Sequence, residues 1–221
     1  MPRKAWDRRN NFRRRIDQRR LYKRYLIMTE GETESTYFNH YKQQPNPIVH
    51  AIDQFDSKRS LVEKSIAERK KRISYGDFIE DLDEAWVVFD RDKSPSNPQD
   101  KTNFNEALQL AKNNKISVAY SNDSFELWLL LHYQVVSSAL HRDVICTKLS
   151  AHIGKTYVHG SKCDLFNEIK ANRQKAISRA EQMLTEQGAT PPESANPSTT
   201  IHLLVQKIMA EPGFRDQQDD T

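Results

Sequence analysis

Apolar residues are concentrated in short runs over the first 135 residues, and amphipathic segments separate these runs. The runs predict four strands, at residues 21–29, 48–52, 84–89 and 116–120. The intervening periodicity predicts helices, at residues 32–43, 57–73, 102–113 and 124–134. Strands that alternate with helical segments of about a dozen residues are typical of βαβ units. The pattern therefore predicts an α/β fold, with a mainly parallel four-stranded sheet and helices on both faces.

The remainder of the chain shows helical periodicity alone. It predicts helices at residues 139–151, 161–186 and 199–210, and a segment rich in Pro, Ser and Asn separates the last two. We therefore expect four parts in the chain. They are a basic N-terminal arm at residues 1–20, an α/β domain at 21–135, a helical region at 136–210 and a disordered tail at 211–221.

Charge is distributed unevenly along the chain. The net charge is +4, yet residues 1–24 hold eleven Lys or Arg and only two Asp, so the rest of the chain is acidic overall. Most of these bases are arginines, which can contact a phosphate through two parallel hydrogen bonds. We expect the arm to bind nucleic acid through Arg8, Arg9, Arg13, Arg14, Arg15, Arg19 and Arg20. The alternatives are a solvated tail, or an arm that packs on the acidic body or on a partner.

Composition excludes several classes of protein. No apolar run approaches the roughly 18 residues of a membrane span, and the basic N-terminus lacks the apolar segment of a signal peptide. Two cysteines cannot form a disulfide framework and fit a reducing compartment. Six glycines argue against a glycine-rich phosphate loop. We therefore expect a cytoplasmic protein that does not act in a membrane.

Acidic residues follow two of the predicted strands. Glu30 and Glu34 come after the first strand, and Asp90 and Asp92 come after the third. Ligands of parallel sheets gather beyond the carboxyl ends of the strands, so neighbouring strands would bring these carboxylates together. Such carboxylates repel one another unless a cation lies between them, and oxygen ligands favour Mg²⁺ or Mn²⁺. The alternative is that these acids cap the helices that follow.

Further candidates lie beyond the fourth predicted strand. Glu126 is either the N3 partner of Asp123 in a capping box, or a residue at the rim of the site that includes a second-metal ligand among its roles. Ser121 and Asn122 reach the same sheet edge, and a loop lysine, Lys155 or Lys162, could offset charge developing on a phosphate. Residue types that bind zinc also occur, with a spacing that matches no usual zinc pattern, at Cys146, His152, His159 and Cys163.

These motifs resemble known proteins. Thr29-Glu30-Gly31 and Asp90-Arg91-Asp92, each at the end of a strand, resemble the TOPRIM fold, and the Glu30 to Glu34 spacing resembles its OLD-type nucleases. Four segments together resemble the RloB-like family over about residues 20–210. They are residues 25–38 (YLIMTEGETESTYF), 89–92, 121–132 (SNDSFELWLLLH) and 196–205 (NPSTTIHLLV).

The resemblance implies a function. Glu30, Asp90 and Asp92 match the metal-binding and catalytic acids of the TOPRIM fold, Glu34 matches the second glutamate of the OLD-type pattern, and the first and third strands are expected to be neighbours. The implied protein is a Mg²⁺- or Mn²⁺-dependent nuclease that hydrolyses DNA or RNA, tRNA included, in bacterial anti-phage defence. Its implied partner is an ABC- or AAA-type ATPase of the same locus. The alternative is a non-catalytic TOPRIM-shaped subunit that binds nucleic acid or the ATPase.

Overall fold

The computed structural model describes residues 23–43, 47–54, 57–91, 99–160, 163–212 and 214. Several predictions fall outside these ranges. They concern the seven arginines of the basic arm, Asp92, Lys162 and nearly all of the C-terminal tail.

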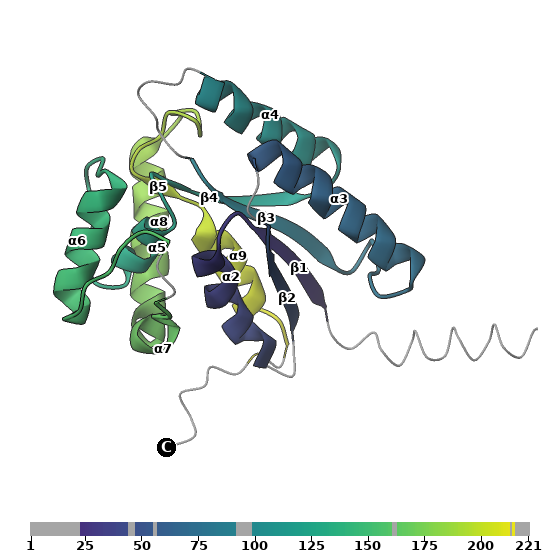
Figure 1. Cartoon of the computed structure of the whole chain (residues 1–221), viewed down its shortest axis with the longest axis horizontal. Helices are drawn as coiled ribbons and strands as arrows, with labels where there is room; N and C mark the ends of the chain where they lie inside the picture. Colours follow the sequence, from purple (N-terminus) through teal and green to yellow (C-terminus); the bar gives the residue numbers. More distant parts are fainter. Residues whose placement is uncertain are drawn as a thin grey trace, which may run out of the picture.

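The centre of the protein is a five-stranded sheet with the order β2-β1-β3-β4-β5 (Figure 1). The strands are β1 (Arg24–Thr29), β2 (Ile48–Asp53), β3 (Glu84–Asp90), β4 (Ser117–Asn122) and β5 (Ser198–Thr199). The first four are parallel to their neighbours, and β5 is antiparallel to β4. The predicted α/β fold with a mainly parallel sheet is therefore confirmed, and β1 and β3 are neighbours as the resemblance implied.

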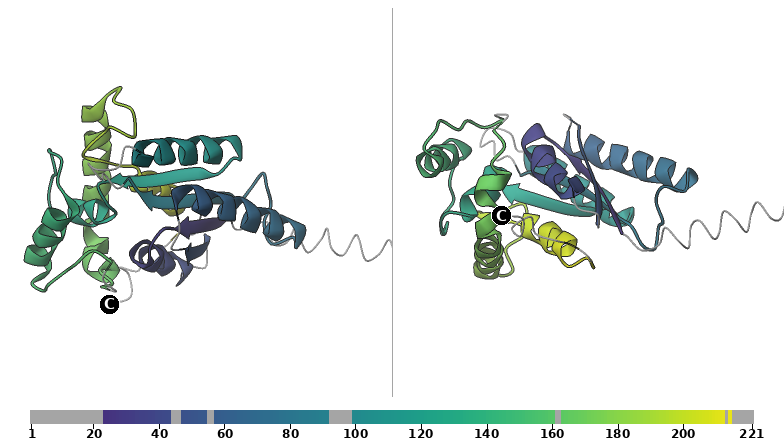
Figure 2. Two further views of the ribbon diagram at one scale, coloured as in Figure 1. Left: turned by 45° about the horizontal axis from the view of Figure 1, so that its top comes forward. Right: turned by 90° about the horizontal axis from the view of Figure 1, so that it is seen from below.

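The two faces of the sheet bury different helices. Successive side chains of β1 point to opposite faces of the sheet. Leu26 and Met28 pack in a cluster with α3 and α4, whereas Tyr25 and Ile27 pack with α2, α5 and α9. The bounds are α2 (Glu32–Asn39), α3 (Lys58–Ser74), α4 (Gln99–Asn113), α5 (Glu126–Leu131) and α9 (Ile201–Met209). Figures 1 and 2 show α3 and α4 together on one side of the sheet. Both faces are thus covered, as predicted.

Three helices of the C-terminal region stand at the carboxyl end of β4, close to β5 (Figure 2). They are α6 (Arg142–Ile153), α7 (Phe166–Ile169) and α8 (Arg173–Gln187). One apolar cluster continues from α2 and β1 through α5 into α8 and α9, so the two predicted parts share a core. None of the helices within the described ranges is long and apolar enough to cross a membrane.

Two predicted helices differ from the structure, and one observed strand was not predicted. The helix predicted at 161–186 is split into α7, a 3-10 turn at Lys170–Asn172 and α8, and the buried Arg173 at the start of α8 lies against the Tyr41 and Phe166 rings. The helix predicted at 32–43 tightens into a 3-10 segment at His40–Gln43. The third difference is β5, a strand of two residues, which is too short to give a periodic signal.

Candidate active site

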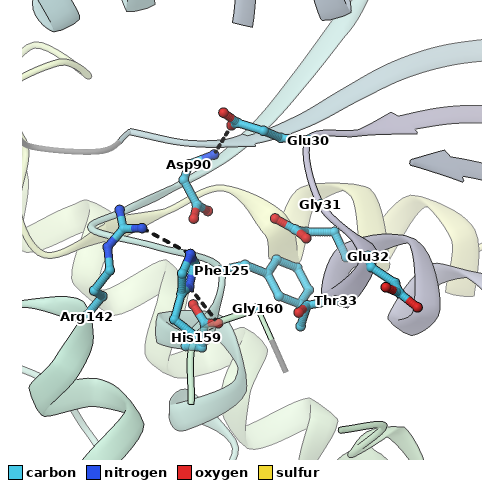
Figure 3. A pocket seen from close by; sticks show the side chains of 11 residues that line it. Glu30, Gly31, Glu32, Thr33, Asp90, Phe125, Arg142, His159 and Gly160 are labelled. Carbon is cyan, nitrogen blue, oxygen red and sulfur yellow. Dashed lines mark hydrogen bonds and ion pairs between the residues drawn. The ribbon is translucent and has the colours of Figure 1, made fainter. Parts of the chain in front are cut away.

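The ends of β1 and β3 bring two predicted acids together. Thr29 is paired with Val88, so Glu30 and Asp90 follow from neighbouring strands at the same edge of the sheet. The backbone N–H of Asp90 donates to Glu30 Oε2 at 3.1 Å, and Lys58 Nζ lies 3.6 Å from Glu30 Oε1 (Figure 3). The adjacency on which the predicted metal site depends is therefore present.

Glu34 reaches the same place from the first turn of α2. Its carboxylate folds back over Gly31, so closely that a Cβ at residue 31 would lie 2.8 Å from Glu34 Oε2. The side chain is buried, and among the described residues no Lys, Arg or His forms an ion pair with it. Burial first, and then the charges of Glu126 and Glu30, raise the pKa of Glu34 to about 8. Glu34 therefore holds a proton at neutral pH in the absence of a cation.

Glu126 also belongs to this site. It is the first residue of α5, is almost fully buried and accepts a hydrogen bond from the Ser124 hydroxyl at 2.6 Å. His159 Nδ1 donates to its Oε1 at 2.9 Å. Burial raises the pKa of Glu126, but the His159 and Ser124 hydrogen bonds together with the charge of His159 outweigh it, so the pKa is lowered overall. The capping-box alternative is wrong, because the N-cap residue of α5 is Phe125 rather than Asp123, and no side chain caps the helix there.

His159 and Arg142 are the residues that sequence reasoning missed. His159 lies between α6 and α7, 33 residues beyond Glu126, and Arg142 begins α6. Arg142 Nη1 donates to His159 Nε2 at 3.0 Å, and Arg142 Nε lies 3.7 Å from Asp123 Oδ2. The hydrogen bond to Glu126 raises the pKa of His159. In the sequence, only the residue type of His159 pointed to metal binding. It was therefore grouped with Cys146, His152 and Cys163 rather than with the acids.

These side chains line one hollow of about 260 Å³. We call it the acidic pocket, and its lining residues include Glu30, Glu34, Asp90, Glu126, Arg142 and His159. Figure 3 shows Asp90, Arg142 and His159 around it, contributed by different parts of the fold. Asp90, Glu126 and His159 each offer a ligand atom, and these atoms lie within 4.8 Å of one another.

Three other candidates lie elsewhere. The Ser121 hydroxyl bonds to Thr199 Oγ1 and the Asn122 amide donates to the Ala195 carbonyl, so both fasten β4 to the segment that contains β5. Lys155 is exposed and pairs with Glu168 at 2.9 Å, outside the lining of the acidic pocket. The structure therefore places Lys155 outside the acidic pocket, and it gives Ser121 and Asn122 contacts with the segment around β5.

The donor set fits a divalent cation. Carboxylates from two strand ends and two helix starts line this partly buried space, and the ligand atoms of Asp90, Glu126 and the His159 imidazole lie close together in it. Bringing buried carboxylates together costs free energy, which a bound cation offsets. The raised pKa of Glu34, which burial causes first, has the direction that this cost predicts.

A family model described as RloB-like protein matches residues 25–208. The chain belongs to the RloB-like family. Comparisons with curated proteins and with solved structures gave no match. The RloB-like match begins within β1 and ends within α9, so it contains every side chain of the acidic pocket and excludes the basic arm.

Proposed function

We propose that this RloB-like protein is a metal-dependent nuclease that hydrolyses phosphodiester bonds of DNA or RNA. The observation that carries the proposal is that several acidic side chains line one pocket at the carboxyl edge of a parallel sheet, with Asp90 and Glu126 close to each other. A protein that only binds polyanions gains nothing from such a cluster, because carboxylates repel phosphates. Hydrolysis is favoured over strand rejoining because no tyrosine lines the acidic pocket among the described residues.

Mg²⁺ or Mn²⁺ is the proposed cofactor. Among the described residues its ligands are drawn from Glu30, Glu34, Asp90 and Glu126, and Asp92 remains a ligand proposed from the sequence. When bound, the cation supplies charge stabilisation at the phosphate and lowers the pKa of a bound water. The chain holds the carboxylates in place through the Asp90 N–H on Glu30 and the Ser124 hydroxyl on Glu126.

Two cationic side chains can receive the phosphate group. Lys58 pairs with Glu30 just outside the lining of the acidic pocket, and Arg142 lines the pocket beside His159. Arg142 has a planar group that can contact two phosphate oxygens at once. We propose that both position the substrate backbone and that the basic arm adds sequence-independent contacts to phosphates further along.

The biological setting is proposed from family membership. RloB-like proteins are associated with phage-defence loci, and we extend the proposal to an anti-phage nuclease that acts with an ABC- or AAA-type ATPase. The second candidate function, called the runner-up below, is that of a non-catalytic subunit that binds nucleic acid or this ATPase. Cleavage by the purified protein separates the two, since the runner-up predicts binding without hydrolysis.

The test is a cleavage assay on plasmid, single-stranded DNA and tRNA, with Mg²⁺, with Mn²⁺ and with EDTA. We expect cleavage of at least one substrate that requires the metal and disappears in Asp90→Ala. The matched control is Asp81→Ala, which removes an exposed carboxylate just before the amino end of β3. Binding of all three substrates with no cleavage in either metal, with or without an added ATPase partner, would favour the runner-up.

A further inference from the structure

Asp90, Glu126 and His159 form a group of possible metal ligands within the acidic pocket. This group contains a nitrogen donor, the imidazole of His159, as well as carboxylate oxygens. They come from β3, from α5 and from the connection between α6 and α7, and are brought together by the tertiary fold alone. Their ligand atoms lie within 4.8 Å of one another. Oxygen and nitrogen ligands of one metal ion, bound at about 2.0–2.2 Å, lie at most about 4.4 Å apart. The three side chains therefore need only a small inward movement to share an ion.

Two of the three side chains are held at their positions. Glu126 is 1% exposed and Asp90 is 6% exposed, and the hydroxyls of Ser124 and Tyr157 both donate to Glu126. His159 is the exposed member, and it reaches Glu126 through Nδ1 while Arg142 contacts Nε2. The hydrogen bond from His159 to Glu126 is the contact that a shared metal ion would replace.

A second observation points to a cation here. Glu34 lines the same pocket with a side chain only 5% exposed, and none of the basic groups within the described ranges forms an ion pair with it. Burying a carboxylate without a cationic partner is costly. A metal ion at Asp90, Glu126 and His159 would bring positive charge close to Glu34, which forms no ion pair among the described residues.

We propose that Asp90, Glu126 and His159 form a mixed oxygen and nitrogen site that binds a divalent transition metal through one imidazole nitrogen. An imidazole ligand favours transition metals over Mg²⁺, so the site selects Mn²⁺ or a later ion of that row. This deepens the proposed function, on which it rests for the use of the metal in cleavage. Binding through Nδ1 places the imidazole proton on Nε2, and Arg142 then keeps Asp123 as its partner.

The experiment is pulsed electron paramagnetic resonance on the full-length protein loaded with Mn²⁺, which detects a directly bound nitrogen by its modulation of the electron spin echo. We expect nitrogen modulation in the wild type and none in His159→Gln. The matched control is His152→Gln, a histidine of α6 that contacts Gln134 and lies outside the lining of the acidic pocket. It should keep the modulation.

Calorimetric titration gives a second readout. His159→Gln should weaken Mn²⁺ binding by at least about tenfold, the lower end of the loss seen when even an outer partner of a ligand is removed. Mg²⁺ binding should change less, and thermal melts confirm that the variant is folded. A wild-type Mn²⁺ complex without nitrogen modulation, modulation that survives in His159→Gln, or no Mn²⁺ binding at all would each overturn the proposal.

The outcomes separate this proposal from the nuclease. Nitrogen-bound Mn²⁺ in a protein that cleaves none of the substrates supports the metal site and contradicts the proposed function. Metal-dependent cleavage without a nitrogen ligand supports the nuclease and overturns the mixed site.

Discussion

The acidic pocket has two sides that were built in different ways. On the sheet side, Glu30 and Asp90 follow directly from paired strands, so their positions are set by the register of β1 against β3. On the opposite side, Arg142 and His159 come from α6 and the connection after it, which reach the pocket only because α6 packs on α5. The two sides therefore differ in origin: the strand ends place the carboxylates of the proposed metal site, whereas the helical region contributes the imidazole and the guanidinium.

The largest expected effect comes from the sheet side. Glu30→Ala and Asp90→Ala should each reduce metal-dependent cleavage by at least about a thousandfold, because the cation supplies several kcal/mol of charge stabilisation and each variant removes a ligand. The measurement is single-turnover cleavage in Mg²⁺ and in Mn²⁺, beside Asp81→Ala. Full activity of Asp90→Ala, with contaminating nuclease excluded, would contradict the account of the sheet side.

A smaller effect is expected from the helical side. Arg142→Ala should slow cleavage by about 10- to 100-fold, because it removes the proposed phosphate contact beside the metal site. Arg179→Ala is the matched control, since this arginine of the C-terminal region donates to the Leu131 carbonyl and lies outside the lining of the acidic pocket. Equal losses in the two variants would mean that Arg142 acts only by supporting the fold.

Most of the sheet side could be predicted from the sequence, since it depends on local pattern. The apolar runs that form β1 and β3 end in acids, and parallel pairing carries both acids to one edge. The position of Glu34 could be predicted in the same way, because one helical turn after Gly31 brings its side chain back to the end of the strand.

The helical side could not be predicted in the same way. His159 lies in an irregular segment far from Glu126 in the sequence, and no periodicity relates the two. Glu126 was ambiguous because an acid at the start of a helix fits a cap equally well. Lys155 was a candidate for contacting a phosphate because it lies in the loop before the predicted C-terminal helix. In the structure it is exposed and pairs with Glu168.

The smallest expected effect concerns Glu34, which lies between the two sides. Its pKa of about 8 in the folded protein exceeds the ordinary value of 4.5, so the folded state binds more protons between these pH values. The free energy of unfolding of the metal-free protein therefore falls as the pH rises from about 4.5 to about 8. Glu34→Gln removes this loss and should stabilise the metal-free protein at pH 8.

The measurement is urea unfolding in EDTA at pH 5 and pH 8. Wild type and Glu34→Gln should be close in stability at pH 5 and separate at pH 8, and added Mn²⁺ should stabilise the wild type more than the variant. Glu32→Gln serves as the control, because Glu32 is a more exposed acid of the same helix turn. A Glu34→Gln protein that is less stable than wild type at pH 8 would show that the carboxylate is paired in a way that this account does not contain.

The central claim is that the acidic pocket binds a divalent cation, and a crystal structure of the protein soaked in Mn²⁺ tests it most directly. The account predicts an anomalous scattering peak inside the pocket, with oxygen ligands from Asp90 and Glu126 and further ligands among Glu30, Glu34 and His159. Manganese found only outside this pocket, in crystals whose pocket is open to solvent, would contradict the claim.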